Sequence, residues 1–148
     1  MKSILISGGA GFLGSSLVRK LATDNKVRVL DNGSRGELTR FKDLPNVEVF
    51  DGDVRNLVDC QSAMLDVDSV YHLAAINGTM SFYKKPWDVL EVGIQGTRNI
   101  LYASAKSKVK EILIASSSEV YHEPEEIPTS EDVPFHIPNP HNPRYSYA

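Results

Sequence analysis

The sequence predicts an α/β protein built on a doubly wound parallel sheet, and three observations support this fold class. Short runs rich in branched aliphatic residues alternate with helical patterns over residues 1–122. Several of these runs are apolar throughout, as expected of parallel strands that are covered on both faces. A glycine-rich turn follows the first run directly, at the point where a strand would end and a helix would begin.

Five runs have the length and composition of strands. They are residues 4–6, 27–30, 47–50, 70–73 and 112–115. Each run is bounded by breakers or charged residues, and right-handed crossovers would join such runs into one parallel sheet. We therefore expect a sheet of five strands.

Helical patterns occupy the intervals between these runs. Leu13, Leu17 and Leu21 recur every four residues and predict one buried face of a first helix, with Val18 beside them. A second helix is predicted over about residues 56–64.

The longest predicted helix runs from about residue 87 to residue 107, directly after a proline suited to a first helical turn. Apolar and small residues recur along it at spacings of three and four: Val89, Val92, Gly93, Gly96 and Ile100. We interpret the two glycines as positions where the helix packs closely against the sheet.

Composition and charge narrow the class of protein. The 148 residues are 41% hydrophobic and 24% charged, which is typical of one globular domain and excludes disordered classes. The sequence has no apolar run long enough for a membrane span and a net charge of only −3, so we expect neither a membrane nor a nucleic-acid partner. Cys60 is the single cysteine, which excludes an internal disulfide and indicates a reducing, cytoplasmic setting.

The composition changes sharply near residue 122. Residues 123–148 hold six of the eight prolines, and five acidic side chains against one arginine. Proline donates no hydrogen bond to a sheet, so this tail is not expected to form a central strand. We predict a sheet domain over residues 1–122, and over residues 123–148 an ordered active-site loop that crosses the carboxyl ends of the strands.

Three glycines shape the turn after the first predicted strand. Gly8 permits a tight turn, Gly11 lets a pyrophosphate approach the backbone, and Gly14 allows close packing of helix against strand. The helix that follows would offer its backbone N–H groups to the phosphates. A glycine-rich turn without a ligand is the simpler alternative.

An acid follows at the end of the second predicted strand. Asp31 lies 17 residues after Gly14, close to the offset of about 20 at which a carboxylate holds the adenosine ribose of a dinucleotide. A carboxylate accepts bonds from both ribose hydroxyls and repels a 2′-phosphate, which favours NAD over NADP, although Arg35 lies close enough to weaken that preference. Asp31 could instead only begin the turn at Asn32 and Gly33.

Together with four further segments, the glycine turn resembles the extended short-chain dehydrogenase/reductase family, in its NAD-dependent nucleotide-sugar epimerase/dehydratase branch. The matching segments are residues 8–14, 31–36, 51–55, 72–75 and 96–99. The resemblance covers essentially the whole chain. It implies a Rossmann-type doubly wound parallel sheet that is incomplete at its C-terminal side.

The resemblance also implies the residues that bind the cofactor NAD. They are Gly8, Gly11, Phe12, Leu13, Gly14, Asp31, Asn32, Ser34, Asp53, Val54, Leu73, Ala74, Ala75 and Ser116. In this pattern Asp53 and Val54 meet the adenine. Two simpler interpretations remain open: Asp53 could cap the next helix, and His72 is expected to have a core or hydrogen-bonded role.

The same resemblance implies Ser117 and Tyr147 as catalytic residues, with the tyrosinate taking a proton from a sugar hydroxyl. Substrate contacts are expected from Thr79, Ser81, Ser118 and Glu119, the first two in a substrate-facing loop at residues 76–83. The serines could instead satisfy backbone groups of their loop. Tyr145 is a weaker candidate for the catalytic base, and no histidine shows the spacing of a metal site.

The family's catalytic lysine would fall at position 151, beyond the last residue. We therefore expect the chain to be an N-terminal portion of an enzyme, without the substrate domain, that binds NAD but does not turn over. Family members commonly dimerise through the long helix and a later one, so a homodimer is expected only of the full-length protein.

The expected activity is that of an NAD-dependent nucleotide-sugar epimerase, acting at C4 by transient oxidation of a sugar hydroxyl. Ser118 stands where 4,6-dehydratases tend to carry an aspartate, which disfavours dehydration. Glu119 also occurs in the branch that decarboxylates UDP-glucuronate. Dehydratase, decarboxylase and a non-catalytic NAD-binding module remain open as alternatives.

Overall fold

Five parallel strands form the centre of the protein in the computed structural model, which describes residues 1–121, 124–134 and 141. The strands are β1 (Ser3–Ser7), β2 (Lys26–Asp31), β3 (Val47–Asp51), β4 (Ser69–His72) and β5 (Glu111–Ile114). They lie in the order β3-β2-β1-β4-β5, and every pair is parallel. The five predicted strands and the α/β class are therefore confirmed.

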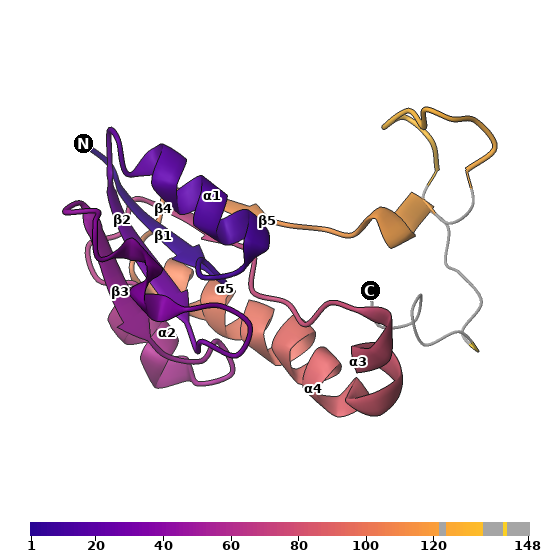
Figure 1. Ribbon diagram of the computed structural model, residues 1–148, viewed down its shortest axis with the longest axis horizontal. Helices are drawn as coiled ribbons and strands as arrows, with labels where there is room; N and C mark the ends of the chain where they lie inside the picture. Colours follow the sequence, from indigo (N-terminus) through magenta and orange to yellow (C-terminus); the bar gives the residue numbers. More distant parts are fainter. Residues whose placement is uncertain (122–123, 135–140, 142–148) are drawn as a thin grey trace.

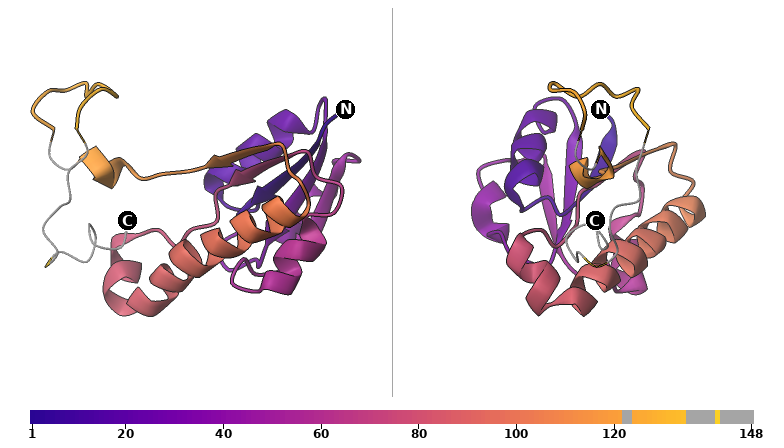
Figure 2. Two further views of the ribbon diagram at one scale, coloured as in Figure 1. Left: turned by 180° about the vertical axis from the view of Figure 1, so that it is seen from behind. Right: turned by 90° about the vertical axis from the view of Figure 1, so that its right-hand side faces the viewer.

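Helices cover both faces of the sheet (Figure 1). They are α1 (Phe12–Leu21), α2 (Leu57–Ala63), α3 (Thr79–Lys84), α4 (Pro86–Leu90) and α5 (Thr97–Lys106). Short 3-10 turns occur at η1 (Leu38–Phe41) and η3 (Ser118–Tyr121). α1 lies on one face, while α2 and α5 lie on the other (Figures 1 and 2). No helix in the described part of the chain is long and apolar enough to cross a membrane.

Alternating side chains of the inner strands build a core on each face. On the α1 face, Ile6 and Val29 pack with the buried Val18 of the helix. On the opposite face, Leu5 and Leu30 pack with residues of α2 and α5. This division follows from the period-2 alternation of strand side chains.

Leu13 departs from the predicted helix face. The prediction placed it on the buried side of the first helix, but its side chain is 71% exposed. The reason is its position in the first turn of α1, beyond the last residue of β1, where the sheet no longer provides a surface to pack on. Leu17 and Leu21 do pack against the core.

The predicted long helix is present, but it contains a π-helical turn, η2 (Glu91–Gly96), between α4 and α5. A Cβ at Gly96 would lie 2.7 Å from Cγ2 of Val54, so the helix does pack closely there, but against the loop after β3 and not against a strand of the sheet. A Cβ at Gly93 would have no atom within 4 Å, so the packing interpretation is wrong for Gly93. The widened turn presents Gly93 to solvent instead of to the sheet.

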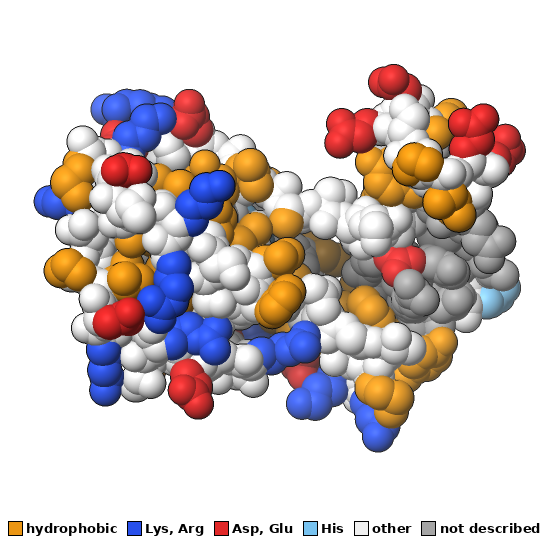
Figure 3. Space-filling model, turned by 45° about the horizontal axis from the view of Figure 1, so that its top comes forward, with side chains coloured by type: hydrophobic (Ala, Val, Ile, Leu, Met, Phe, Trp, Pro, Cys, Tyr) orange, Lys and Arg blue, Asp and Glu red, His pale blue; other side chains and the backbone are white. Residues whose placement is uncertain are grey.

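β5 is the edge strand on the side of β4. Ile112, Leu113 and Ile114 are each partly exposed, although neighbouring side chains in a strand point to opposite faces. After Ile114 the chain leaves the sheet, and residues 115–121 and 124–134 project outward beyond the carboxyl ends of the strands (Figure 1). The surface is hollowed between this projecting segment and the body that contains the sheet (Figure 3).

Candidate functional site

The turn between β1 and α1 lies at the carboxyl edge of the sheet. Gly8 has φ +71°, and a Cβ there would come within 2.7 Å of the backbone nitrogen of Ala74. A Cβ at Gly14 would overlap the carbonyl oxygen of Gly8. The backbone N–H of Gly11 donates to that same carbonyl over 3.1 Å. The turn therefore tolerates no side chain at Gly8 or Gly14, as the glycine pattern predicts.

The N-terminus of α1 opens outward from this turn. No side chain caps the helix at Gly11, and its first turn carries no acidic residue. Phe12, the first residue of α1, is 90% exposed. An uncapped helix N-terminus presents backbone N–H donors and the positive end of the helix dipole, which together suit an anion such as a pyrophosphate.

Asp31 ends β2 beside this turn. Its Oδ2 accepts a 2.9 Å hydrogen bond from the backbone N–H of Ala10, and its Oδ1 accepts one of 2.9 Å from Gly33. Asp31 therefore does begin the local turn, and it also faces the glycine loop. A carboxylate has about four lone-pair sites, so two remain for further hydrogen-bond donors such as ribose hydroxyls.

Two arginines fix this region in ways that the sequence did not indicate. Arg40 of η1 donates from Nη1 to the carbonyl of Ala10 over 2.9 Å and so anchors the glycine loop from outside. Arg35 donates from Nη1 to the carbonyl of Asn77 over 2.7 Å, and so links the segment after β2 to the loop after β4. Neither contact has a sequence signal, because each joins segments far apart in the chain.

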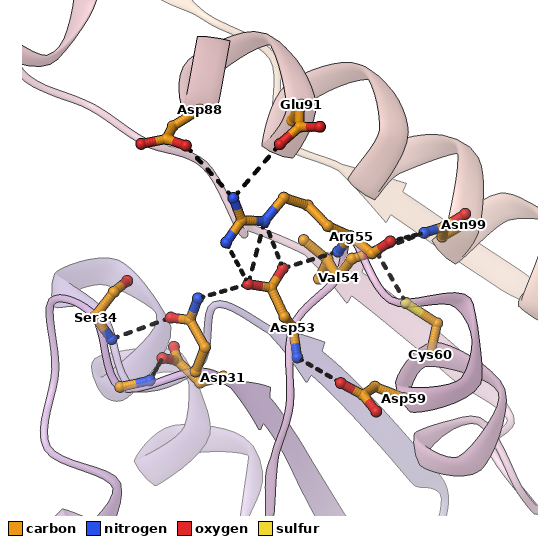
Figure 4. Close-up of polar contacts among 12 residues, drawn as sticks. Asp31, Ser34, Asp53, Val54, Arg55, Asp59, Cys60, Asp88, Glu91 and Asn99 are labelled. Atoms are coloured by element: carbon orange, nitrogen blue, oxygen red, sulfur yellow. Dashed lines mark hydrogen bonds and ion pairs between the residues drawn. The ribbon is translucent and has the colours of Figure 1, made fainter. Parts of the chain in front are cut away.

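Asp53, in the loop after β3, is held by Arg55 two residues later (Figure 4). Nη2 of Arg55 lies 2.7 Å from Oδ2 of Asp53, and these hydrogen bonds lower the pKa of Asp53 to about 2. Asp53 does not cap the following helix, so that alternative is wrong. Asn56 caps α2 instead, because its side chain accepts from the backbone N–H of Val58.

His72 joins three elements beneath the site. Its Nδ1 lies 2.6 Å from Oγ of Ser7, and its Nε2 lies 2.9 Å from Oγ1 of Thr97. Only 4% of the residue is exposed, and this burial lowers its pKa to about 4, so the ring is neutral near pH 7. The predicted hydrogen-bonded core role of His72 is confirmed.

The small residues after β4 lie against the glycine loop. The tight approach of Gly8 to Ala74 places residues 73–75 beside the turn, at the carboxyl ends of β1 and β4. The structure therefore gathers the predicted cofactor residues of the first four segments along one edge. Whether these residues bind the cofactor remains a prediction.

The predicted reacting residues lie apart from this edge or outside the description. Ser117 is half-buried, and its Oγ accepts from the backbone N–H of Glu119 over 3.2 Å, as the simpler interpretation of the serines allows. Ser116 and Ser118 are exposed on the segment that leaves β5. Tyr145 and Tyr147 lie outside the described residues.

The predicted substrate-facing loop is partly helical. Thr79 and Ser81 belong to α3, which begins after Gly78 at φ +109°, so the prediction of a loop through residue 83 is wrong. Ser81 donates from Oγ to the carbonyl of Asn77 over 3.5 Å. Over residues 1–121, 124–134 and 141, no group of three or more His, Cys, Asp or Glu side chains is arranged to hold a metal ion.

Nearly the whole chain is similar in sequence to known proteins. The model of the NAD-dependent epimerase/dehydratase family matches residues 4–148. UDP-glucuronic acid decarboxylase 1 of Danio rerio is 37% identical over 150 residues, which cover 99% of this chain and 34% of that protein. A UDP-glucose 4-epimerase of Halalkalibacterium halodurans is 33% identical over 142 residues, which cover 94% of this chain and 42% of that protein.

A similar fold occurs in solved structures. The UDP-glucose 4-epimerase of Bifidobacterium longum, solved in complex with NAD+ and UDP, aligns with a TM-score of 0.84 at 27% identity. The alignment covers 99% of this chain and 45% of that one. The chain thus spans between about a third and a half of the length of these relatives.

Proposed function

The chain belongs to the NAD-dependent epimerase/dehydratase family, and we propose that it supplies the NAD-binding part of an enzyme that acts on a nucleotide sugar. Family membership confirms the resemblance seen in the five sequence segments, and the family's NAD dependence confirms the expected cofactor. The observation that carries the proposal is the gathering of the glycine turn, Asp31 and residues 73–75 along one sheet edge. We assign residues 1–122 to the NAD-binding domain and residues 123–148 to an active-site loop.

The residues at this edge fit a dinucleotide. A Cβ at Gly8 or Gly14 would collide with backbone atoms of the chain, so only glycines allow this tight turn, and the N-terminus of α1 that follows it is uncapped. When bound, NAD supplies the hydride acceptor that oxidises the carbon of a sugar hydroxyl. The backbone N–H groups of the turn would hold the pyrophosphate, and the carboxylate of Asp31 would accept the ribose hydroxyls and repel a 2′-phosphate.

Other residues complete the proposed cofactor contacts. Asp53 and Val54 would meet the adenine, Asn32 and Ser34 would border the ribose, and Ser116 would lie near the nicotinamide half. Arg35 donates to the carbonyl of Asn77, which supports a preference for NAD because that hydrogen bond already engages the first guanidinium that follows Asp31 in the sequence.

We propose that Ser117 and Tyr147 act on the sugar hydroxyl. The phenolate oxygen of Tyr147 would take the hydroxyl proton, and Oγ of Ser117 would hold the same hydroxyl by a hydrogen bond. A tyrosine has a pKa near 10, so ionising it at pH 7 costs roughly 4 kcal/mol unless neighbouring positive charge offsets that cost. Thr79, Ser81, Ser118 and Glu119 would contact the substrate.

Two reactions are candidates. We favour 4-epimerisation because Ser118 replaces the aspartate expected of a dehydratase. Decarboxylation of UDP-glucuronate is the second candidate, since Glu119 also occurs in that branch and relatives named UDP-glucuronic acid decarboxylase match 99% of this chain.

We also propose that the full-length protein forms a homodimer through the long helix. Trp87, Ile94 and Leu101 lie along this helix and expose large apolar side chains. Large exposed apolar side chains on a helix are typical of a surface that packs against a partner.

Two assays on the protein expressed from its whole gene test these proposals. Titration calorimetry should show NAD binding with a preference over NADP, and absence of NAD binding would contradict the proposed cofactor site. Incubation with UDP-glucose, UDP-glucuronate and dTDP-glucose then separates the reactions by product. UDP-galactose supports epimerisation, whereas UDP-xylose or a 4-keto-6-deoxy sugar supports decarboxylation or dehydration in its place.

A further inference from the structure

Arg55 is the centre of a polar cluster at the end of β3 (Figure 4). Its Nε lies 3.1 Å from Oδ1 and 3.2 Å from Oδ2 of Asp53, and its Nη2 lies 2.7 Å from Oδ2. Its backbone N–H donates to Oδ1 over 2.9 Å. One residue therefore fixes both oxygens of the Asp53 carboxylate.

Among the described residues, one further side chain donates to this carboxylate from another segment. Nδ2 of Asn32 donates to Oδ2 of Asp53 over 3.0 Å. Asn32 directly follows Asp31, in the segment where the adenosine ribose is proposed to bind. A carboxylate has about four lone-pair sites, and the three donors of Arg55 (the backbone N–H, Nη2, and Nε shared between the two oxygens) occupy about three of them. The remaining site therefore faces the ribose segment, where an exposed neutral amide now fills it.

The far side of Arg55 faces the long helix. Its Nη1 lies 3.6 Å from Oδ1 of Asp88 in α4 and 3.7 Å from Oε2 of Glu91 in η2. The two acids hold the guanidinium from the side opposite Asp53 (Figure 4). They restrict the rotation that a flexible side chain would otherwise have.

The backbone of the same segment is also tied to this helix. Nδ2 of Asn99, in α5, donates to the carbonyls of Val54 and Arg55 over 2.9 and 2.8 Å. Gly96 packs directly on Val54. Because Asn99 anchors the backbone of Val54 and Arg55, the role that is left to the Arg55 side chain is to orient the Asp53 carboxylate.

We propose that Arg55 is a positioning residue that makes the site specific for a 6-aminopurine. It orients Asp53 so that one lone pair of Oδ2 faces the ribose segment and accepts the exocyclic amino group of adenine in place of the Asn32 amide. Asp88 and Glu91 hold Arg55 in that orientation. This inference rests on the proposed NAD-binding function.

The chemistry of the base explains the specificity. Adenine has an amino group at C6, which donates a hydrogen bond to the fixed carboxylate. Hypoxanthine has a carbonyl at C6, whose oxygen cannot donate and is repelled by the carboxylate oxygen. A hydrogen bond to a charged group contributes more to affinity than one between neutral groups, so its loss lowers affinity by about tenfold or more. Without Arg55 the carboxylate is free to turn, and the distinction between the two bases fades.

Calorimetric titration of the whole-gene protein with NAD and with nicotinamide hypoxanthine dinucleotide tests the proposal. The wild type should prefer NAD by about tenfold. Arg55→Met should bring this ratio of dissociation constants close to one, mainly by weakening NAD binding. Arg55→Lys should restore part of the ratio, because lysine keeps the charge without the planar fork. Asp88→Asn combined with Glu91→Gln should lower the ratio by about twofold, as expected for exposed ion pairs.

Arg19→Met is the matched control, since Arg19 pairs with Asp43 over 2.9 Å on the outer side of α1. It should leave the ratio unchanged. If Arg55→Met weakens both dinucleotides equally and keeps the tenfold ratio, Arg55 is merely structural and the inference is wrong. If the wild type binds neither dinucleotide, the proposed function fails, and this inference fails with it.

Discussion

At the carboxyl edge of the sheet, the described residues are more deeply buried and more firmly hydrogen-bonded on the side of β1, β2 and β3 than on the side of β5. On the side of β1, β2 and β3, Asp31 and Asp53 are held by hydrogen bonds from the chain itself, and Leu5 and Leu30 are fully buried. On the side of β5, Leu113 is half exposed and the predicted reacting serines lie on a segment that leaves the sheet.

This difference separates the residues proposed to bind the cofactor from the residues proposed to react. The side of β1, β2 and β3, where we propose that the adenosine half of NAD binds and which we call the adenosine side, is organised by contacts among residues 3–106. Its geometry therefore does not depend on the segment that follows β5. Ser117 makes a hydrogen bond within its own segment, which does not fix its position relative to the sheet. We therefore expect cofactor affinity to reside in the first side and turnover to depend on further contacts around the second.

Core substitutions should show the largest difference between the two sides. Leu5→Ala removes a fully buried side chain at the centre of the sheet and should lower the free energy of unfolding by about 2–5 kcal/mol. Leu113→Ala, in the half-exposed edge strand, should lower it by about 1 kcal/mol. Urea denaturation of the 148-residue chain measures both values. Equal losses would show that β5 is covered in solution.

We expect acid to destabilise the folded chain through His72 of β4, whose buried neutral ring is hydrogen-bonded to Ser7 of β1. Burial lowers its pKa from 6.5 to about 4, so between these values the unfolded chain binds more protons than the folded chain. Stability from this group is complete above pH 6.5 and declines as the pH falls towards 4, by about 3 kcal/mol in all.

Urea denaturation between pH 7 and pH 4 follows this loss. His72→Gln should flatten the curve in that range. Asp53 should not contribute to the change in this range. Its pKa is lowered from 3.8 to about 2, so the stability that it provides is present above pH 3.8 and is lost only as the pH falls towards 2. An unchanged curve in His72→Gln would assign the acid sensitivity to other groups.

The same substitution at two helical glycines should have opposite effects. Gly14→Ala forces a Cβ against the carbonyl of Gly8, so it should destabilise the chain by about 1–3 kcal/mol and weaken NAD binding. Gly93→Ala meets nothing within 4 Å and should stabilise the helix by about 0.5–1 kcal/mol. Thermal unfolding with and without NAD compares the two variants, and a tolerated Gly14→Ala would contradict the geometry of the turn.

Much of the fold follows from local sequence patterns. The five strands can be predicted because each is a short aliphatic run between breakers. The turn can be predicted because Gly8 has a positive φ and a side chain at Gly14 would overlap the carbonyl of Gly8, so both positions require glycine. Asp31 was located by its distance from that turn. These features depend on neighbours in sequence.

The features that were missed depend on contacts between distant segments. Arg40 anchors Ala10 across 30 positions, and Arg55 meets Asp88 and Glu91 across 33 and 36. No periodic pattern marks such residues. The π-helical turn was missed for a related reason, since its six residues follow the spacing of an ordinary helix and the widening appears only in three dimensions. Leu13 was misplaced because periodicity does not show where the sheet ends.

Amide chemical-shift mapping of the protein with NAD tests the central claim most directly. If NAD binds along the adenosine side, the largest shifts should fall on residues 8–14, 31–34 and 53–54, while residues 111–113 should move little. The Asp31→Asn variant should reduce the shifts at a given NAD concentration, because it removes the charge that is proposed to hold the ribose. Shifts that leave residues 8–14 unchanged would contradict the account.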